Sequence, residues 1–239
     1  MSLKQTITEK ASALSSAEFS YTVTSDFEGA KDLDLDCSGI VMDATLLFVQ
    51  IKNQSFLLKT GKRLAARIYK FYYHALNEIC KETHGYLNCY SPEGFLLIYP
   101  KELHDVADVV DIAIKTADLI STGLKDIIEL HSHINFAIGV DKGNILGTKT
   151  HTDGGNDHIS WFGTAINKAI AISHECAKPF YVGVSGTVYQ HLDEDHRVAT
   201  KRILGIKKHV DIWTSVSYQF ESVKKHLYQT NFHKSFDEE

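Results

Sequence analysis

The segment DATLLFVQIKN, from Asp43 to Asn53, joins a solid apolar run to a polar end. The run begins at Leu46 and stops at Gln50, and two further polar residues follow within three positions. Four to eight apolar residues bounded by polar ones are typical of a strand that is buried on both faces. Because α/β folds place their chemistry where such a strand ends, the segment also marks candidate site residues.

Two long amphipathic helices are predicted on the C-terminal side of this strand. Apolar residues recur at helical spacing through 62–84 and again through 104–128. Between the two helices, 86–90 and 95–99 are short β-prone segments, separated by Ser91-Pro92-Glu93-Gly94. Proline and glycine in that position indicate a hairpin turn.

The second half of the chain continues the alternation of strands and helices. We predict a strand at 133–141, a tight turn at 142–144, a polar mobile arm at 148–158, a helix at 163–176, a strand at 180–184 and two strands within 197–216. The fold class is therefore α+β, with a mixed, mostly antiparallel sheet and helices packed on one face.

The ends of the chain are predicted to lie outside this main domain. We place a helix (3–15) and a lead-in within residues 1–38, the main domain at 39–216 and a polar tail with a weak helical pattern at 217–239.

Composition narrows the possible functions. The formal net charge is −5, the pI is about 6.2 and no lysine or arginine stripe stands out, which argues against nucleic acid as the main partner. The four cysteines have no CxxC spacing, so we expect free thiols in a reducing compartment. Because no signal peptide and no membrane-spanning apolar run is evident, we predict a cytoplasmic protein.

Four stretches carry a resemblance to the class III nucleotidyl (adenylyl/guanylyl) cyclase catalytic domain. They are the strand that contains Gln50, the hairpin GYLNCYSPEGFLLIY at 85–99, IGVDKGNILG at 138–147 and WFGTAINKAIAIS at 161–173. The resemblance implies a ferredoxin-like core. The small size and the DAT that enters the first strand make the chain similar to standalone bacterial pyrimidine cyclases of antiphage systems.

The resemblance also implies a reaction and a set of partners. In the family, the 3′-hydroxyl of a nucleoside triphosphate attacks its own α-phosphate and releases pyrophosphate, with two Mg²⁺ or Mn²⁺ ions held by two aspartates. An asparagine and an arginine on one helix of the other protomer stabilise the transition state. We therefore expect a homodimer that binds nucleotide. A complementary cyclase subunit or a cyclic-nucleotide effector remains a possible further partner.

Several family positions are changed in this chain. The two metal positions hold Gln50 and Glu93, of which only Glu93 carries a charge. The catalytic asparagine is kept as Asn167, but the arginine one turn later is Ala171. The implied nucleotide-binding positions are Asn167 and, in addition, the following four residues: Ile51, Lys52, Cys89 and Ser160.

Three functions remain open at this stage. The first is a degenerate cyclase that keeps the fold and dimer, and the second is an active cyclase with an altered metal site. The third is a partner-binding domain without nucleotide. Individual features also have structural explanations: Asn167 could serve a structural hydrogen bond, the glycines at 139, 143, 147 and 163 could mark tight turns, and the His and Asp residues of 151–158 could form a solvated loop rather than a metal site.

Overall fold

The computed structural model describes residues 2–25, 37–91, 93–127, 135–151, 157–176, 178–179, 181–203 and 206–236. The chain forms two compact units. One unit consists of residues 1–43 and 144–163, and the other consists of residues 44–143 and 164–239. Two long strands, β2 (Ser38–Lys52) and β5 (Asn135–His151), each run through both units.

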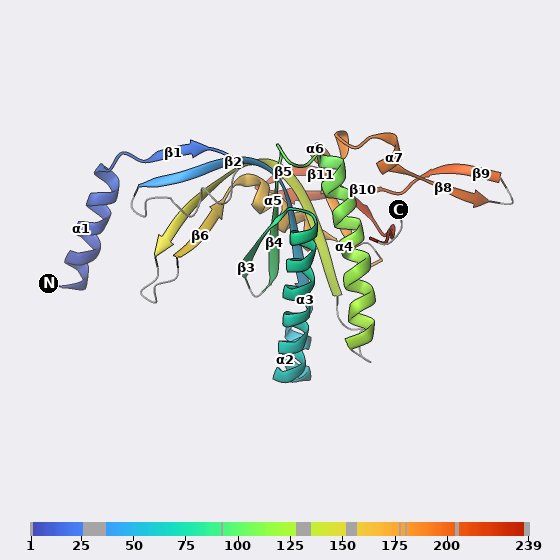
Figure 1. Cartoon of the computed structure of the whole chain (residues 1–239), viewed down its shortest axis with the longest axis horizontal. Helices are drawn as coiled ribbons and strands as arrows, with labels where there is room; N and C mark the ends of the chain where they lie inside the picture. Colours follow the sequence, from blue (N-terminus) through green and yellow to red (C-terminus); the bar gives the residue numbers. More distant parts are fainter. Residues whose placement is uncertain are drawn as a thin grey trace. The chain divides into compact units, whose positions relative to one another are not determined.

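Figure 1 shows the elements in chain order. Besides β2 and β5, they are α1 (Leu3–Ser16), β1 (Ser20–Val23), α2 (Gln54–Thr60), α3 (Lys62–Glu82), β3 (Tyr86–Ser91), β4 (Gly94–Pro100), α4 (Val106–Ile127), β6 (Asp157–Phe162), α5 (Thr164–Glu175), β7 (Val182–Ser185), α6 (Gly186–Gln190), α7 (Glu194–Arg197), β8 (Val198–Ile203), β9 (Ile206–Asp211), β10 (Thr214–Phe220) and β11 (Val223–Thr230).

The larger unit is built on a mixed sheet with the strand order β10-β11-β7-β5-β2-β4-β3. Of the neighbouring pairs with a defined register in this unit, only β5 with β7 is parallel. The predicted α+β fold with a mostly antiparallel sheet is therefore confirmed. Every residue of β2 from Ala44 to Ile51 is buried, as expected for a strand covered on both faces.

The helices α3 and α4 pack side by side on one face of this sheet (Figure 1). On α3, the buried residues Ile68, Tyr72 and Leu76 follow one another at four-residue spacing, so they form a single apolar stripe. They share one core with Leu47 and Val49, the odd-numbered residues of β2.

The helix α5 packs on the opposite face, which corrects the expectation that all helices lie on one face. Ile172 of α5 and Cys176, directly after the helix, form a separate apolar cluster with Ala137, Tyr218 and Leu227 of three strands. In β5, Ala137 stands between Phe136 and Ile138, and these two neighbours belong to the α3–α4 core. Since successive strand residues point to opposite faces, the two clusters lie on the two sides of the sheet.

The smaller unit contains α1, β1, β6 and the adjoining parts of β2 and β5. Here β1 pairs in parallel with the start of β2, and β6 pairs antiparallel with the end of β5, from Leu146↔Phe162 to His151↔Asp157. The helix α1 buries no residue, although a capping box at Ser2 and Gln5 defines its start.

Three segments differ from their sequence-based predictions. The chain runs through 142–144 as part of β5 without a tight turn, and 148–151 and 157–158 are strand residues rather than a loop arm. The predicted polar tail forms most of the β10–β11 hairpin, which joins the sheet through β7. Its turn residues Glu221 and Ser222 have φ values of 48° and 64°, the pattern of a type I′ hairpin turn.

No helix among the described residues has both the length and the apolar character needed to cross a membrane.

Candidate functional site

Gln50, the predicted metal position at the end of the central strand, is 6% exposed and is held by α5. Its Nε2 lies 2.9 Å from Nδ1 of His174, and its Oε1 lies 3.5 Å from Oγ of Ser173. The single hydroxyl hydrogen of Ser173 is donated to the backbone oxygen of Ile170 at 2.7 Å. The nitrogen end of the Gln50 amide is therefore the end that is held by α5.

Lys52, two residues further along the same strand face, caps the C-terminal end of α5. Its Nζ donates to the backbone oxygen of His174 at 3.0 Å and also to that of Cys176. A cation there opposes the negative end of the helix dipole and satisfies carbonyls that lack a partner in the helix. Burial lowers the pKa of Lys52, while the charges of Cys176 and Glu175 act in the opposite direction. Lys52 thus has a structural role at a position predicted to bind nucleotide.

The middle of α5 lies directly on the backbone of β5. A Cβ added at Gly139 would come within 1.9 Å of the carbonyl oxygen of Ala169 and 2.6 Å of the nitrogen of Ser173. Only glycine leaves room for this approach. At the neighbouring strand, a Cβ on Gly183 would lie 2.4 Å from Sγ of Cys176. Gly139 is therefore required for helix packing and not for a turn.

Asn167, the predicted catalytic residue, is exposed on α5. The buried side of that helix is formed by Ala165, Ile166, Ala169, Ile172 and Ser173. The asparagine therefore does not lie on the buried face, and its side chain is available for contacts outside its own chain. Ala171, at the position of the family arginine, packs against the small apolar cluster under α5.

Asp141 is a buried carboxyl group that sequence reasoning did not single out. Its side chain is 1% exposed; Oδ1 accepts a hydrogen bond from Oγ of Ser185 at 2.5 Å, and Nζ of Lys168 lies 3.6 Å from Oδ2. Oδ2 has no hydrogen-bond partner among the described residues. Burial raises the pKa of Asp141, although Ser185 and Lys168 partly offset this effect. Burial, Asp141 and Glu175 also raise the pKa of Tyr218 to about 12.

The Asp141–Lys168 ion pair determines where the ammonium group of Lys168 lies. Lys168 follows Asn167 in the sequence, but its ammonium group is directed to the sheet and not to the exposed side of α5. One feature of the sequence could have indicated that Asp141 is buried. It follows Ala137 and Gly139 at two-residue spacing, so it lies on the same face of β5 as they do.

Glu93, the second predicted metal position, lies in the turn between β3 and β4 and is exposed. Its backbone oxygen accepts a hydrogen bond from Ile51 at 2.9 Å, so the ends of β2 and β4 bring Glu93 close to Gln50 along the backbone. Its charge contributes, after burial, to raising the pKa of Tyr69 on α3. The amide of Gln50, by contrast, faces α5.

These residues do not fit the two-metal site that the fold family implies. Divalent ions such as Mg²⁺ need several oxygen ligands around one point. Among the described residues, no group of three or more His, Cys, Asp or Glu side chains could hold a metal ion. Gln50 is neutral and 6% exposed, and its amide nitrogen lies 2.9 Å from Nδ1 of His174. The predicted Mg or Mn binding by Gln50 and Glu93 has no converging ligand set to support it.

The remaining predicted residues are distributed over both units. Ile51 is 1% exposed, and its side chain belongs to the α3–α4 core. Cys89 belongs to β3, but its side chain lies outside the described residues. Ser160 is half-buried in β6 of the smaller unit, opposite Thr148. Most of the His and Asp cluster at 151–158 also lies outside the described part of the chain.

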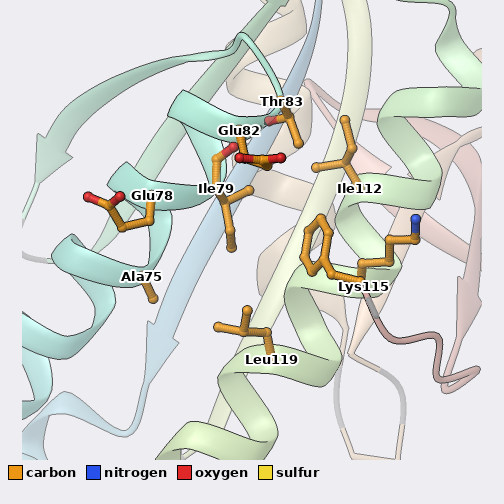
Figure 2. A pocket seen from close by; sticks show the side chains of 9 residues that line it. Ala75, Glu78, Ile79, Glu82, Thr83, Ile112, Lys115 and Leu119 are labelled. Carbon is orange, nitrogen blue, oxygen red and sulfur yellow. Dashed lines mark hydrogen bonds between the residues drawn. The ribbon is translucent and has the colours of Figure 1, made fainter. Parts of the chain in front are cut away.

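A groove of about 560 Å³ lies between α3 and α4, on the sheet face opposite Gln50. Figure 2 shows Ile79 and Ile112 reaching into it from the two helices, with Glu82 beside them. Phe236, near the C-terminus, closes one side beneath Lys115, whose Nζ lies 5.5 Å from the ring centre. None of the sequence-predicted site residues lines this groove.

Comparisons with known proteins identify the fold. No family model matches the sequence, and no curated protein matches it. Among solved structures, the guanylyl cyclase Cya2 has a TM-score of 0.62 at 11% identity, covering 84% of this chain and 97% of that one. The adenylyl cyclase CyaB from P. aeruginosa has a TM-score of 0.61 at 10% identity, covering 82% and 97%.

A third similar structure is described as a class III adenylyl cyclase-like ATP-binding protein from Pseudomonas aeruginosa. It has a TM-score of 0.59 at 12% identity, and the match covers 79% of this chain and 43% of that one. The fold of this chain is therefore that of the class III adenylyl/guanylyl cyclase catalytic domain.

Proposed function

We propose that this chain is a degenerate nucleotidyl cyclase, which keeps the fold, forms a homodimer and binds a nucleoside triphosphate without cyclising it. The observation that carries the proposal is the contact of 2.9 Å between Nε2 of Gln50 and Nδ1 of His174 on α5. Where cyclases of this class need a free carboxylate for metal, this chain has a neutral amide that holds α5 in place.

The proposed site also lacks a cation to stabilise the negative charge that develops on the phosphate in the transition state. Ala171 offers a methyl group where the family has an arginine, and the neighbouring Lys168 is paired with Asp141. Loss of one charge-stabilising group typically lowers kcat by about 10²–10⁴-fold. Two such losses on one transition state are enough to make turnover negligible.

Ground-state binding of nucleotide needs less than catalysis does. Asn167 is exposed, so it can reach a ligand or a second chain. A two-fold dimer that directs Asn167 of one protomer toward Glu93 of the other would use the exposed side of α5 for this contact. The similarity to a cyclase-like protein described as ATP-binding is consistent with binding in this fold.

The test combines binding with turnover. We expect ATP, GTP, CTP or UTP to raise the melting temperature, because a ligand at about 100 times its Kd adds about 2.7 kcal/mol of stability. We expect no cyclic nucleotide from the same samples with Mn²⁺. Asn167→Ala should abolish the shift, whereas Asn77→Ala, an asparagine on α3 on the other sheet face, should keep it. Absence of a shift with every triphosphate would favour a partner-binding domain instead.

An active metal-dependent cyclase with an altered metal site is the alternative function. The observation that favours it is Glu93, which retains a carboxylate beside the end of the central strand. Cyclic nucleotide and pyrophosphate formed by the unmodified protein, and lost in Glu93→Ala, would establish this alternative and refute the first proposal.

Restoring the family residues gives a second test of degeneracy. Gln50→Asp with Ala171→Arg returns a carboxylate and a cation, so the double variant should gain more activity than the product of the single gains. His174 and Lys52 lie close enough to pair with the new carboxylate, so we expect His174→Ala to increase the gain further.

A further inference from the structure

The strand β10 forms one edge of the main sheet in the larger unit. It pairs with β11 on one side, and among the described residues no strand pairs with its other side. Its residues, from Thr214 to Phe220, carry no charge, include no proline and pair with β11 without a shift in register. Charges, prolines and bulges are the features by which edge strands avoid pairing with another chain. The open edge of β10 lacks all three.

The opposite edge of the same sheet, at β3, is different. The register between β3 and β4 shifts between Asn88 and Ser91, and Pro92 follows directly in the sequence. An irregularity of this kind bends a strand and interrupts its pairing. One edge of the sheet is thus irregular, whereas the edge at β10 is regular and uncharged.

The turn of the β10–β11 hairpin determines which backbone groups of β10 face outward. A two-residue turn joins Phe220 to Val223, and these two residues are paired in the register. In a hairpin of this kind, the pair that closes the turn exchanges both of its backbone hydrogen bonds. Because hydrogen-bonded and non-hydrogen-bonded pairs alternate, Ser215, Ser217 and Gln219 direct their N–H and C=O groups to the open edge.

The other end of β11 supports this assignment. The backbone oxygen of Thr230 accepts a hydrogen bond from the backbone nitrogen of Tyr181, directly before β7, at 3.1 Å. The even-numbered residues of β11 therefore face β7, and the odd-numbered ones face β10. Their partners in β10 are the even-numbered residues, from Thr214 to Phe220, which leaves the odd-numbered residues of β10 directed outward.

The sequence of β10 is complementary to itself in the antiparallel direction. When two copies of the strand pair about Ser217, each Val216 lies opposite Tyr218 of the other copy, and each Ser215 lies opposite Gln219. The first pair joins a β-branched and an aromatic side chain, a combination that stabilises antiparallel strands, and the second joins two polar side chains. The outward-facing residues of the two copies then meet one another, so each both donates and accepts a backbone hydrogen bond.

This register also continues the two surfaces of the sheet. Val216 and Tyr218 belong to the apolar cluster under α5, whereas Ser215, Ser217 and Gln219 are exposed on the other face. Since successive strand residues point to opposite faces, a second copy sets its apolar side chains beside those of the first and its polar ones beside the polar ones.

We propose that β10 pairs with β10 of a second copy about Ser217, which joins the two main sheets into one continuous sheet across a two-fold axis. A single strand from each copy makes the contact, so the interface is small and the association is weak and reversible. It uses neither Asn167 nor Glu93, so it is independent of nucleotide and is an interface in addition to the dimer proposed above.

Oxidative cross-linking of variants with one added cysteine tests the register. We expect Ser217→Cys to give a disulfide-linked dimer, because the Cα atoms of directly opposed, hydrogen-bonded residues lie about 5.5 Å apart, within the range for a disulfide. Ser215→Cys is the matched control: the two introduced thiols lie four strand residues apart, at about 14 Å, which is too far.

The unmodified protein gives the background from the native cysteines, of which Cys80 and Cys176 are buried. Equal cross-linking of the two variants, or no cross-linking above this background, would overturn the proposal.

Sedimentation of the full chain tests the association itself. Ser217→Lys sets two like charges opposite each other, so we expect the association constant to fall by about fivefold. A mixture of Ser217→Lys with Ser217→Glu should restore the association, since opposite charges then meet at the axis. Thermal melting of each variant checks that it is folded.

The control for added charge is His226→Lys. His226 is exposed and lies opposite Ser217 on β11, so this variant carries the same charge on the neighbouring strand, away from the open edge. It should associate as the unmodified protein does. An association that Ser217→Lys leaves unchanged, or that both lysine variants weaken equally, would show that the copies do not meet at β10.

Discussion

The two faces of the main sheet are packed in different ways. On the α3–α4 face, large apolar side chains such as Tyr72, Leu76 and Leu97 fill the space between helices and sheet. On the α5 face, the helix approaches the strand backbone at Gly139 and is held by polar side chains at its C-terminal end. The first face is stabilised mainly by apolar volume, and the second mainly by close contact and hydrogen bonds.

This difference shows that α5 depends on a few specific contacts rather than on a large apolar surface. Gln50, Lys52 and Lys168 each form a polar contact within the protein on this face. The contrast between the faces can be measured as four changes in stability, from the largest expected effect to the smallest.

The largest loss is expected for Leu76→Ala on the α3–α4 face. Leu76 is fully buried, and removing its side chain loses transfer energy and leaves a cavity, at a cost of about 2–5 kcal/mol. Urea denaturation measures this free energy of unfolding. Tyr73→Ala removes an even larger side chain from the same helix, but Tyr73 is 46% exposed, so a smaller loss is expected. Equal losses would show that this face does not depend on buried volume.

Gly139→Ala is the corresponding test of close contact on the α5 face. The added methyl group meets backbone atoms of Ala169 and Ser173, which cannot rotate away, so we expect a loss of about 3 kcal/mol. Gly186→Ala is the matched control, because its Cβ would lie 3.6 Å from the nearest atom. If Gly139→Ala were tolerated as well as Gly186→Ala, α5 would not rest on the strand backbone.

Lys52→Met tests the polar cap of α5 at a smaller scale. Methionine keeps the aliphatic stem but loses the ammonium group and its bonds to the last helix carbonyls, so a loss of about 1 kcal/mol is expected. Lys59→Met in the last turn of α2 is the control: Lys59 is exposed, so only a dipole contribution of a few tenths of a kcal/mol is at stake.

The smallest effect at neutral pH is expected for Asp141→Asn, and its size should depend on pH. Burial raises the pKa of this carboxyl above that of the unfolded chain, so protonation favours the folded state. The stability of the wild type relative to the variant should therefore increase as pH falls through the folded-state pKa. This increase should level off below the unfolded-state pKa of about 3.9. Urea titrations of both proteins over this pH range measure the difference. An opposite slope would mean that Lys168 and Ser185 outweigh the burial of Asp141.

The sequence predicted the fold because its strongest signals are local. The apolar stripe through Ile68, Tyr72 and Leu76 and the unbroken apolar run of β2 define elements without reference to the rest of the chain. The β10–β11 hairpin was missed because Glu221 and Ser222 adopt positive φ values that asparagine and glycine usually adopt. Phe220, Val223 and Leu227 then gave spacings of three and four residues that are typical of a helix.

The candidate site was less predictable, because its contacts join residues far apart in the chain. Gln50 and His174 are 124 positions apart, and nothing in either segment indicates that they meet. A tight turn was one explanation offered for Gly139. The structure shows that glycine is needed there because α5 approaches the strand backbone, which the local sequence does not reveal. The exposure of Asn167 and the burial of Asp141 likewise depend on how α5 lies on the sheet, which periodicity alone does not fix.

The helix α1 has a consequence for how the protein responds to heat. Its fourteen residues have a well-formed N-cap but bury nothing, and Leu3, Ile7 and Leu14 are 76%, 58% and 63% exposed. A helix of this length without a buried face follows the helix–coil equilibrium of a peptide. Its amide hydrogens should therefore exchange early and independently of the core, and its helical signal should fade gradually on warming, before the cooperative melting of the sheet.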